Sequence, residues 1–148
     1  MFVILSALLF GCRLHFQMKG LIFQPTESVD DIWIGSSEGK KFRLHLGDDG
    51  QYFPYLTGCA ADIQATRVGR HLWVEEWTIT DAGDGSAPFL GMVYRDGLDV
   101  MLNDINTGHA LQLKGDWDFV ELIDKPVLVT GIIVGPHLLQ VVNLKILE

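Results

Sequence analysis

A group of aromatic residues that could stack on a flat ligand lies near the middle of the chain: Tyr52, Phe53, Tyr55, Trp73 and Trp77. Aromatic rings on an open sheet can bind the face of a base or a sugar. The same rings can instead fill a core, because Trp73 and Trp77 share parity on one expected strand and each buries a large area. Core packing is the stronger interpretation, and Tyr52, Tyr55, Trp73 and Trp77 are kept as the candidate ligand-binding residues.

A base-stacking site would also need a basic groove. The basic residues near these aromatics are Lys40, Lys41, Arg43, Arg67 and Arg70. The whole chain carries 11 Lys and Arg against 19 Asp and Glu, a net charge of −8, and has no basic run. Binding to nucleic acid requires clustered cations that displace counterions from phosphates. The composition therefore disfavours nucleic acid, and it fits a soluble protein or one that meets a basic partner.

Catalysis by an activated nucleophile finds no support in the sequence. Ser86 lies in Gly-Asp-Gly-Ser-Ala, which lacks the strand–turn–helix pattern of a nucleophile elbow. Cys59 and His71 could meet in space, but Cys59 lies between Gly and Ala and is typical of a small buried residue. Glu75 and Glu76 are adjacent, so on a regular strand they point to opposite faces and cannot form a catalytic pair. We predict no catalytic residue and expect a protein that is not an enzyme.

Metal binding is not predicted either. The histidines show no metal-ligand spacing, and each is expected on the surface or at a strand end: His15, His45, His71, His109 and His137. Two Asp- and Gly-rich stretches begin at Asp48 and Asp81, but both lack the alternating oxygen ligands and the distal Glu of a calcium loop. They are predicted to be turns. No metal and no cofactor are expected.

The N-terminus carries the clearest localisation signal. Residues 1–11 are apolar and too few to span a bilayer, but they match the length of the apolar region of a secretory signal. The end of this stretch, Leu9-Phe10-Gly11-Cys12, resembles the lipobox of bacterial lipoproteins. That resemblance implies cleavage before Cys12 and a diacylglycerol on its thiol. No Lys or Arg precedes the apolar run, which departs from the family pattern; the alternative is that residues 2–10 form a first strand or helix of the fold.

The remaining chain is predicted to be mainly β. Alternating and β-branched runs predict strands over residues 16–24, 32–34, 41–46, 52–57, 70–80, 89–94, 97–103 and 109–114. Residues 125–147 form two apolar runs around Gly135-Pro136 and predict a closing hairpin with at least one buried face. Helices are expected over residues 60–68, ended by Gly69, and over residues 116–124, where Asp118 and Glu121 fit a capping box.

The order of these elements suggests small barrels. Residues 13–148 are expected to form one β-barrel-type domain with an internal echo between residues 16–94 and 95–148. In each half a Gly (Gly58, Gly115) precedes a short amphipathic piece, a basic residue and an apolar strand. This arrangement resembles OB-like small barrels, either as one barrel or as two tandem half-modules. The resemblance concerns the fold alone, and OB-like folds carry many unrelated functions.

Together these features predict a non-catalytic protein of the bacterial cell envelope or periplasm, exported and lipid-anchored at Cys12, that binds a protein partner or an envelope polymer. Two alternatives stay open. One is a cytoplasmic acidic β-barrel that sequesters a basic partner, as immunity-like inhibitors do. The other is an oligonucleotide-binding OB protein.

Overall fold

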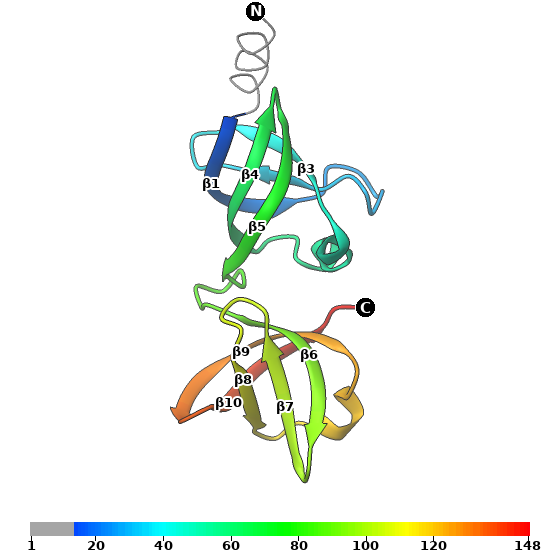
Figure 1. The fold of residues 1–148 in the computed structure, drawn as a ribbon, viewed down its shortest axis with the longest axis vertical. Coiled ribbons are helices and arrows are strands. Elements are labelled where there is room, and N and C mark those ends of the chain that lie inside the picture. Colours follow the sequence, from blue (N-terminus) through cyan, green and yellow to red (C-terminus); the bar gives the residue numbers. More distant parts are fainter. Residues whose placement is uncertain (1–13) are drawn as a thin grey trace, which may run out of the picture. The chain divides into compact units, whose positions relative to one another are not determined.

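The computed structural model describes residues 14–148 (Figure 1). The predicted signal segment, residues 1–12 with the lipidation site Cys12, lies outside these residues. Within the described chain no helix has the length and apolar character required to cross a bilayer. The mainly β fold predicted from the sequence is confirmed: two five-stranded barrels account for nearly all regular structure.

The first barrel closes in the order β1-β2-β3-β5-β4. Antiparallel pairs join β1 to both β2 and β4, whereas β3 and β5 run parallel. A 3-10 helix, η1, connects β3 to β4. The elements are β1 (Leu14–Phe23), β2 (Trp33–Gly35), β3 (Lys41–His45), η1 (Asp48–Tyr55), β4 (Ala60–Val68) and β5 (His71–Asp81).

The second barrel repeats this order as β6-β7-β8-β10-β9, again with its third and fifth strands, β8 and β10, parallel. A short 3-10 helix, η2, occupies the same place between the third and fourth strands. The elements are β6 (Phe89–Asp96), β7 (Asp99–Asp104), β8 (Ala110–Lys114), η2 (Phe119–Leu122), β9 (Pro126–Gly135) and β10 (Leu138–Ile146).

The chain divides into two compact units after Thr78. The sequence placed the internal boundary sixteen residues later, after Tyr94, within a single barrel-type domain. The echo also paired non-equivalent positions: Gly58 precedes β4, whereas Gly115 precedes η2. What the two barrels share is their strand order. A comparison of short sequence patterns does not detect such a repeat.

The helix predicted over residues 60–68 is wrong, because these residues form β4. Their side chains alternate in burial, with Ala61, Ile63 and Ala65 facing the core of the first barrel. Apolar residues at every second position are the pattern of a strand, which the helix prediction overlooked, and pairing with β1 places them in the sheet. Gly69, expected to end a helix, instead has a positive φ of 61° in the turn to β5.

Two other predicted elements also differ. Residues 52–57 do not form a strand; most belong to η1, in which Phe53 is buried, and the following Leu56 is buried too. The helix predicted over residues 116–124 is a single 3-10 turn, and the side chain of Asp118 makes no capping hydrogen bond. In each barrel this segment joins the third strand to the fourth, which are not neighbours in the sheet, so the chain must leave the sheet between them.

The closing hairpin is confirmed as β9 and β10, with its turn at Pro136-His137. One stretch of β9, Val127 to Thr130, is buried in the second barrel. The part nearer the turn is not, because Ile132, Ile133 and Val134 are all at least half exposed. The apolar sequence therefore overstates how much of this hairpin enters the core.

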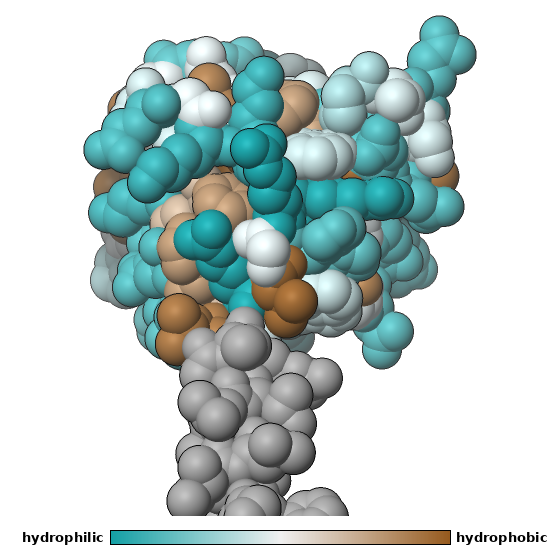
Figure 2. Space-filling model, turned by 90° about the horizontal axis from the view of Figure 1, so that it is seen from above, coloured by the Kyte–Doolittle hydropathy of each residue, from teal (hydrophilic) through white to brown (hydrophobic). Residues whose placement is uncertain are grey.

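A glycine in the first strand of each barrel permits a close approach between strands. A Cβ atom on Gly20 in β1 would overlap the carbonyl oxygen of Gly35 in β2. In the second barrel a Cβ atom on Gly91 in β6 would overlap the carbonyl oxygen of Asn103 in β7. Neither position therefore has room for a larger side chain. Outward-facing positions are mainly hydrophilic on the face shown in Figure 2.

Candidate functional site

A hollow of about 620 Å³ lies in the first barrel. It lies between the loop that joins β1 to β2, the end of β3, and η1. Because side chains alternate along β3, Leu44 enters the core while Arg43 and His45 face outward. The polar lining comes from Asp30, Arg43, His45, Gln51 and Tyr55.

Asp31 holds Arg43 at the edge of this hollow. The Arg43 Nε and an Asp31 carboxylate oxygen are 3.8 Å apart. The same carboxylate accepts hydrogen bonds from the Trp33 indole at 2.6 Å and from the Thr26 hydroxyl at 2.9 Å. The Trp33 hydrogen bond is the main cause that lowers the pKa of Asp31, with further lowering by Thr26 and Arg43. An ionised, well-held carboxylate therefore restricts the guanidinium.

A stack of rings lies beside the hollow on the outer side of β3 and β5. His45 and Trp73 are directly paired in the parallel register, and their rings stack with centroids 4.4 Å apart and planes 10° apart. His71 approaches from the same strand as Trp73, and its Nδ1 lies 2.8 Å from Nε2 of His45. Partial burial lowers the pKa of His45, and the nearby charges of His71 and Arg43 lower it further. A neutral His45 presents a flat polar ring at neutral pH.

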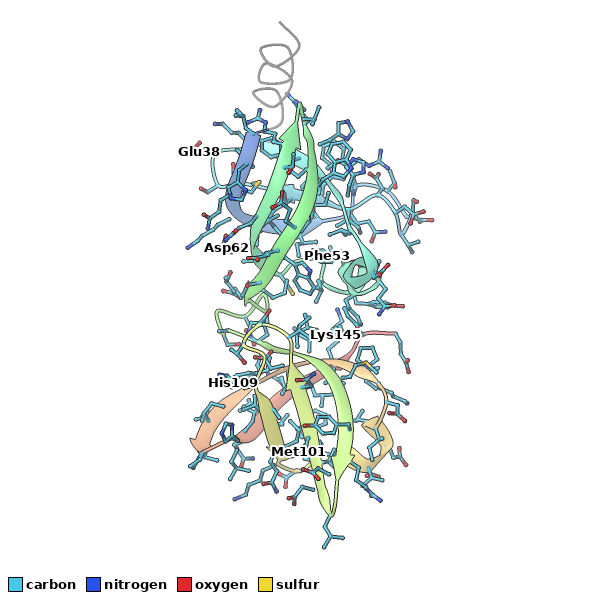
Figure 3. All side chains as sticks on the ribbon, in the orientation of Figure 1. Glu38, Phe53, Asp62, Met101, His109 and Lys145 are labelled. Carbon is cyan, nitrogen blue, oxygen red and sulfur yellow. The ribbon has the colours of Figure 1, made fainter. Side chains whose placement is uncertain are left out.

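The four predicted ligand-binding residues occupy different environments. Tyr55 is exposed and lines the hollow, and Trp73 is 46% exposed in the ring stack. Core packing therefore does not describe Trp73. Trp77 instead packs edge-on against the fully buried Phe53, with ring centroids 4.8 Å apart. Phe53 is labelled in Figure 3. Tyr52 is half-buried in η1 and lines neither this hollow nor a smaller one that adjoins it.

A second, smaller hollow of about 290 Å³ adjoins the first. Its lining includes Trp77, Val74 and Glu75 from β5. It shares Leu46, Gly47 and Gly50 with the larger hollow. The two hollows therefore flank one short segment between β3 and η1, and together they extend the candidate surface from β3 to β5.

The chemistry considered for Cys59 and His71 does not assemble. Cys59 is 4% exposed within the core, as predicted for a small buried residue, whereas His71 lies on the outer surface. Residues 14–148 contain no group of three or more His, Cys, Asp and Glu side chains arranged as metal ligands. The Asp-rich stretch at Asp81 is a turn as predicted, since its carboxylate accepts hydrogen bonds from the amides of Gly83 and Gly85.

The contacts of His45 with His71 and Trp73 were not predicted from the sequence. These residues alternate outward along their own strands, which the sequence does indicate. Their meeting depends on the parallel pairing of β3 with β5, two strands that are not consecutive in the chain.

No protein-family model, no curated protein and no solved structure matches this chain. The interpretation of the site therefore depends on its own geometry.

Proposed function

We propose that this chain is a non-catalytic binding protein of the cell envelope, exported and lipid-anchored at Cys12, whose first barrel binds a glycan-type envelope polymer. The observation that carries the proposal is the exposed Trp73–His45 ring stack beside a hollow of about 620 Å³ lined by Arg43, Asp30 and Gln51. An exposed aromatic face next to planar hydrogen-bonding groups suits a sugar, which has both apolar ring faces and hydroxyl edges.

The strand order supports this choice. Both barrels have the 1-2-3-5-4 order of an OB-like fold, with a short helix between the third and fourth strands. Such barrels bind oligosaccharides and oligonucleotides with the face of strands 2 and 3 and with the neighbouring loops. The larger hollow lies beside β3 and the β1–β2 loop, which is the corresponding place in the first barrel. The net charge of −8 favours a sugar over a nucleic acid.

The binding proposal is tested with Trp73→Ala and a matched control, Trp117→Ala. Trp117 belongs to the second unit and is 41% exposed, close to the 46% of Trp73. We expect Trp73→Ala to weaken binding to purified cell-wall glycan roughly tenfold to a hundredfold, since one stacked ring contributes about 1–3 kcal/mol. Trp117→Ala should bind like the wild type. Equal binding by all three proteins would contradict the proposal.

The location is tested separately, by fractionation and intact mass of the native protein and of Cys12→Ser. We expect the wild type in the membrane fraction, without residues 1–11 and with an added lipid mass. Cys12→Ser should lack the lipid and leave that fraction. An unmodified full-length wild-type chain in the cytoplasm would contradict the export proposal, and a cytoplasmic binding module would take its place.

A protein partner is the second candidate, and the exposed part of the β9–β10 hairpin favours it. Ile132 and Val134 share one face of β9, and each is at least half exposed. Exposed apolar side chains that share a face are typical of protein-binding surfaces. Crosslinking from position 132 should capture one protein that binds the purified chain, and Ile132→Thr with Val134→Thr should abolish that binding. Leu98→Thr, an exposed apolar change in another turn, is the control.

A further inference from the structure

Four basic residues line a groove at one end of the first barrel. The groove measures about 300 Å³, and Lys40, Lys41, Arg67 and Arg70 surround it together with Gly39 and Phe42. Lys41 is the first residue of β3 and Lys40 precedes it, whereas Arg67 lies near the end of β4 and Arg70 lies in the β4–β5 turn. The turn and the start of β3 are neighbours because the Arg43 amide donates a hydrogen bond to the Arg70 carbonyl oxygen at 2.9 Å. Strand pairing thus brings the four basic residues to one groove, although about thirty positions separate the first from the last in the sequence.

Aromatic rings hold one of these cations in place. The Arg67 guanidinium lies over two rings, 5.1 Å from the centroid of Phe16 and 4.9 Å from that of Phe42. Its Nε also donates a hydrogen bond to the Gly69 carbonyl oxygen at 2.9 Å. These contacts fix the plane of the guanidinium before any ligand arrives, which reduces the entropy lost on binding an oxyanion.

Few carboxylates neutralise the groove. Lys40 pairs loosely with Glu38 at 3.9 Å. Within residues 14–148, no carboxylate lies within ion-pair distance of Lys41, Arg67 or Arg70. Glu75, on the neighbouring part of β5, accepts a hydrogen bond from Thr66 and lies 4.0 Å from His15. The groove is therefore a local positive site on a chain whose net charge is −8.

The groove lies at the end of the barrel where the described chain begins. Leu14 pairs with Arg67 in the β1–β4 register, so the start of β1 is adjacent to the groove. Figure 1 shows β1 starting at the same end of the barrel as the β4–β5 turn. Leu14 is 60% exposed and Val68 is 41% exposed beside these cations. Figure 2 looks onto this end, where hydrophobic residues lie among hydrophilic ones.

We propose that this groove binds the phosphate of an anionic phospholipid headgroup and holds the first barrel against the membrane surface. The proposal deepens the proposed function, because it takes the Cys12 anchor as its starting point. One residue separates Leu14 from Cys12 in the sequence, so two extended residues of chain span at most about 7 Å between them. A lipid on Cys12 would place the groove at headgroup depth. A lipid chain combined with a basic patch is a common pair of membrane signals, and exposed apolar residues beside cations suit the interface.

The shape of the groove favours a single phosphate over a nucleic acid strand. A nucleic acid strand needs a row of cations that follows several successive phosphates. Each such contact makes the binding affinity more sensitive to salt. Here four basic residues line one compact hollow, and the rest of the acidic chain would repel a long polyanion. A headgroup phosphate presents one charge at a fixed depth, which matches this arrangement.

The test measures how the full-length chain, carrying Cys12→Ser so that lipidation plays no part, distributes onto vesicles. The vesicles contain phosphatidylcholine alone or with about one-third phosphatidylglycerol. The apolar residues 1–11 are the same in all variants, so any membrane binding that they cause is common to all of them. Binding to the neutral vesicles measures that contribution. The groove variant combines Lys40→Gln, Lys41→Gln and Arg70→Gln. The control combines Lys19→Gln, Arg95→Gln and Lys114→Gln, three exposed cations elsewhere with the same total change in charge.

We expect the protein to prefer anionic over neutral vesicles, and the groove variant to lose roughly a hundredfold of that preference, since each cation at an anionic surface contributes about a fivefold change. The control should stay within a few-fold of its parent, and about 0.5 M salt should abolish the preference. Arg70→Glu alone should also remove most of it.

Four results would overturn the proposal. The first three are equal binding to both kinds of vesicle, equal losses in the groove and control variants, and tighter binding of a single-stranded oligonucleotide than of anionic vesicles. The fourth comes from inorganic phosphate and glycerol phosphate in solution. If these bind the groove as tightly as the vesicles do per phosphate, the ligand is a soluble phosphate and the membrane contact is wrong. None of these results depends on glycan binding by Trp73 or on processing at Cys12, so the two proposals fail independently.

Discussion

His45 and His71 share a hydrogen bond of 2.8 Å between Nε2 and Nδ1, although 26 positions separate them in the chain. The parallel pairing of β3 with β5 brings them together. In the same register Trp73 lies opposite His45, and the two rings stack. Such a bond needs one ring nitrogen that donates and one that accepts, so it exists only while at least one ring is neutral. This pair makes the candidate surface sensitive to pH.

Stability of the first barrel should fall when the pH is lowered through the ordinary histidine pKa of 6.5. Burial, His71 and Arg43 lower the pKa of His45 in the folded protein, so the unfolded chain binds more protons between that lowered pKa and 6.5. Stability is therefore fully present above 6.5 and is lost progressively as the pH falls to the lowered value. Urea unfolding between pH 7.5 and 5, together with an NMR titration of the His45 ring, measures this effect.

His45→Gln is the control for that pH dependence. The variant cannot titrate at this position, so its stability should change less steeply with pH over the same window. An identical slope in the variant and the wild type would show that other groups cause the loss of stability.

Gly20→Ala should destabilise the first barrel by about 1–3 kcal/mol, because the new methyl group would overlap the carbonyl oxygen of Gly35 and force β1 away from β2. Gly47→Ala is a suitable comparison, since a Cβ atom there meets nothing within 4 Å and its φ is −82°. That variant should unfold within about 0.5–1 kcal/mol of the wild type. Urea unfolding of the full chain measures both changes, and similar losses would contradict the steric argument.

Asp104→Ala should cost the second barrel about 3 kcal/mol. Asp104 is 1% exposed, and its carboxylate accepts hydrogen bonds from the amides of Leu90 and Asn106 and from the Thr107 hydroxyl. Removing it leaves these donors without their acceptor at the β7–β8 turn. Asp99→Ala removes an exposed carboxylate that accepts from Gln112 and should cost less than about 1 kcal/mol. Thermal unfolding compares the two variants, and equal shifts would show that the buried network contributes nothing special.

Phe53→Ala should destabilise the first barrel by about 3–5 kcal/mol, since Phe53 is fully buried in η1 and supports the edge of Trp77. The fluorescence of Trp77 should shift to longer wavelength as water reaches the indole. Tyr52→Ala, in the same 3-10 helix but half-buried, should cost less. A similar cost for both changes would mean that η1, and not the Phe53 contact, determines stability.

The sequence by itself determined the fold class and most strand positions. The alternation along residues 41–46 predicted a strand, because the two-residue period is a local property, and in the structure it places Leu44 inward and Arg43 and His45 outward. The closing hairpin was also predicted, since its turn residues and apolar runs are contiguous. The helix prediction failed at β4, where the alternation of Ala61, Ile63 and Ala65 indicates a strand.

Only the tertiary structure decided which strands become neighbours, and the candidate surfaces depend on that. Parallel pairing of β3 with β5 assembled His45, His71 and Trp73. The same pairing brought the two lysines at the start of β3 to the two arginines near the β4–β5 turn. The exposure of Trp73 was likewise undetermined, since an aromatic residue at an alternating position suits either face. Contacts between distant strands are set by the free energy of closing the whole barrel, and no short stretch of sequence contains that information.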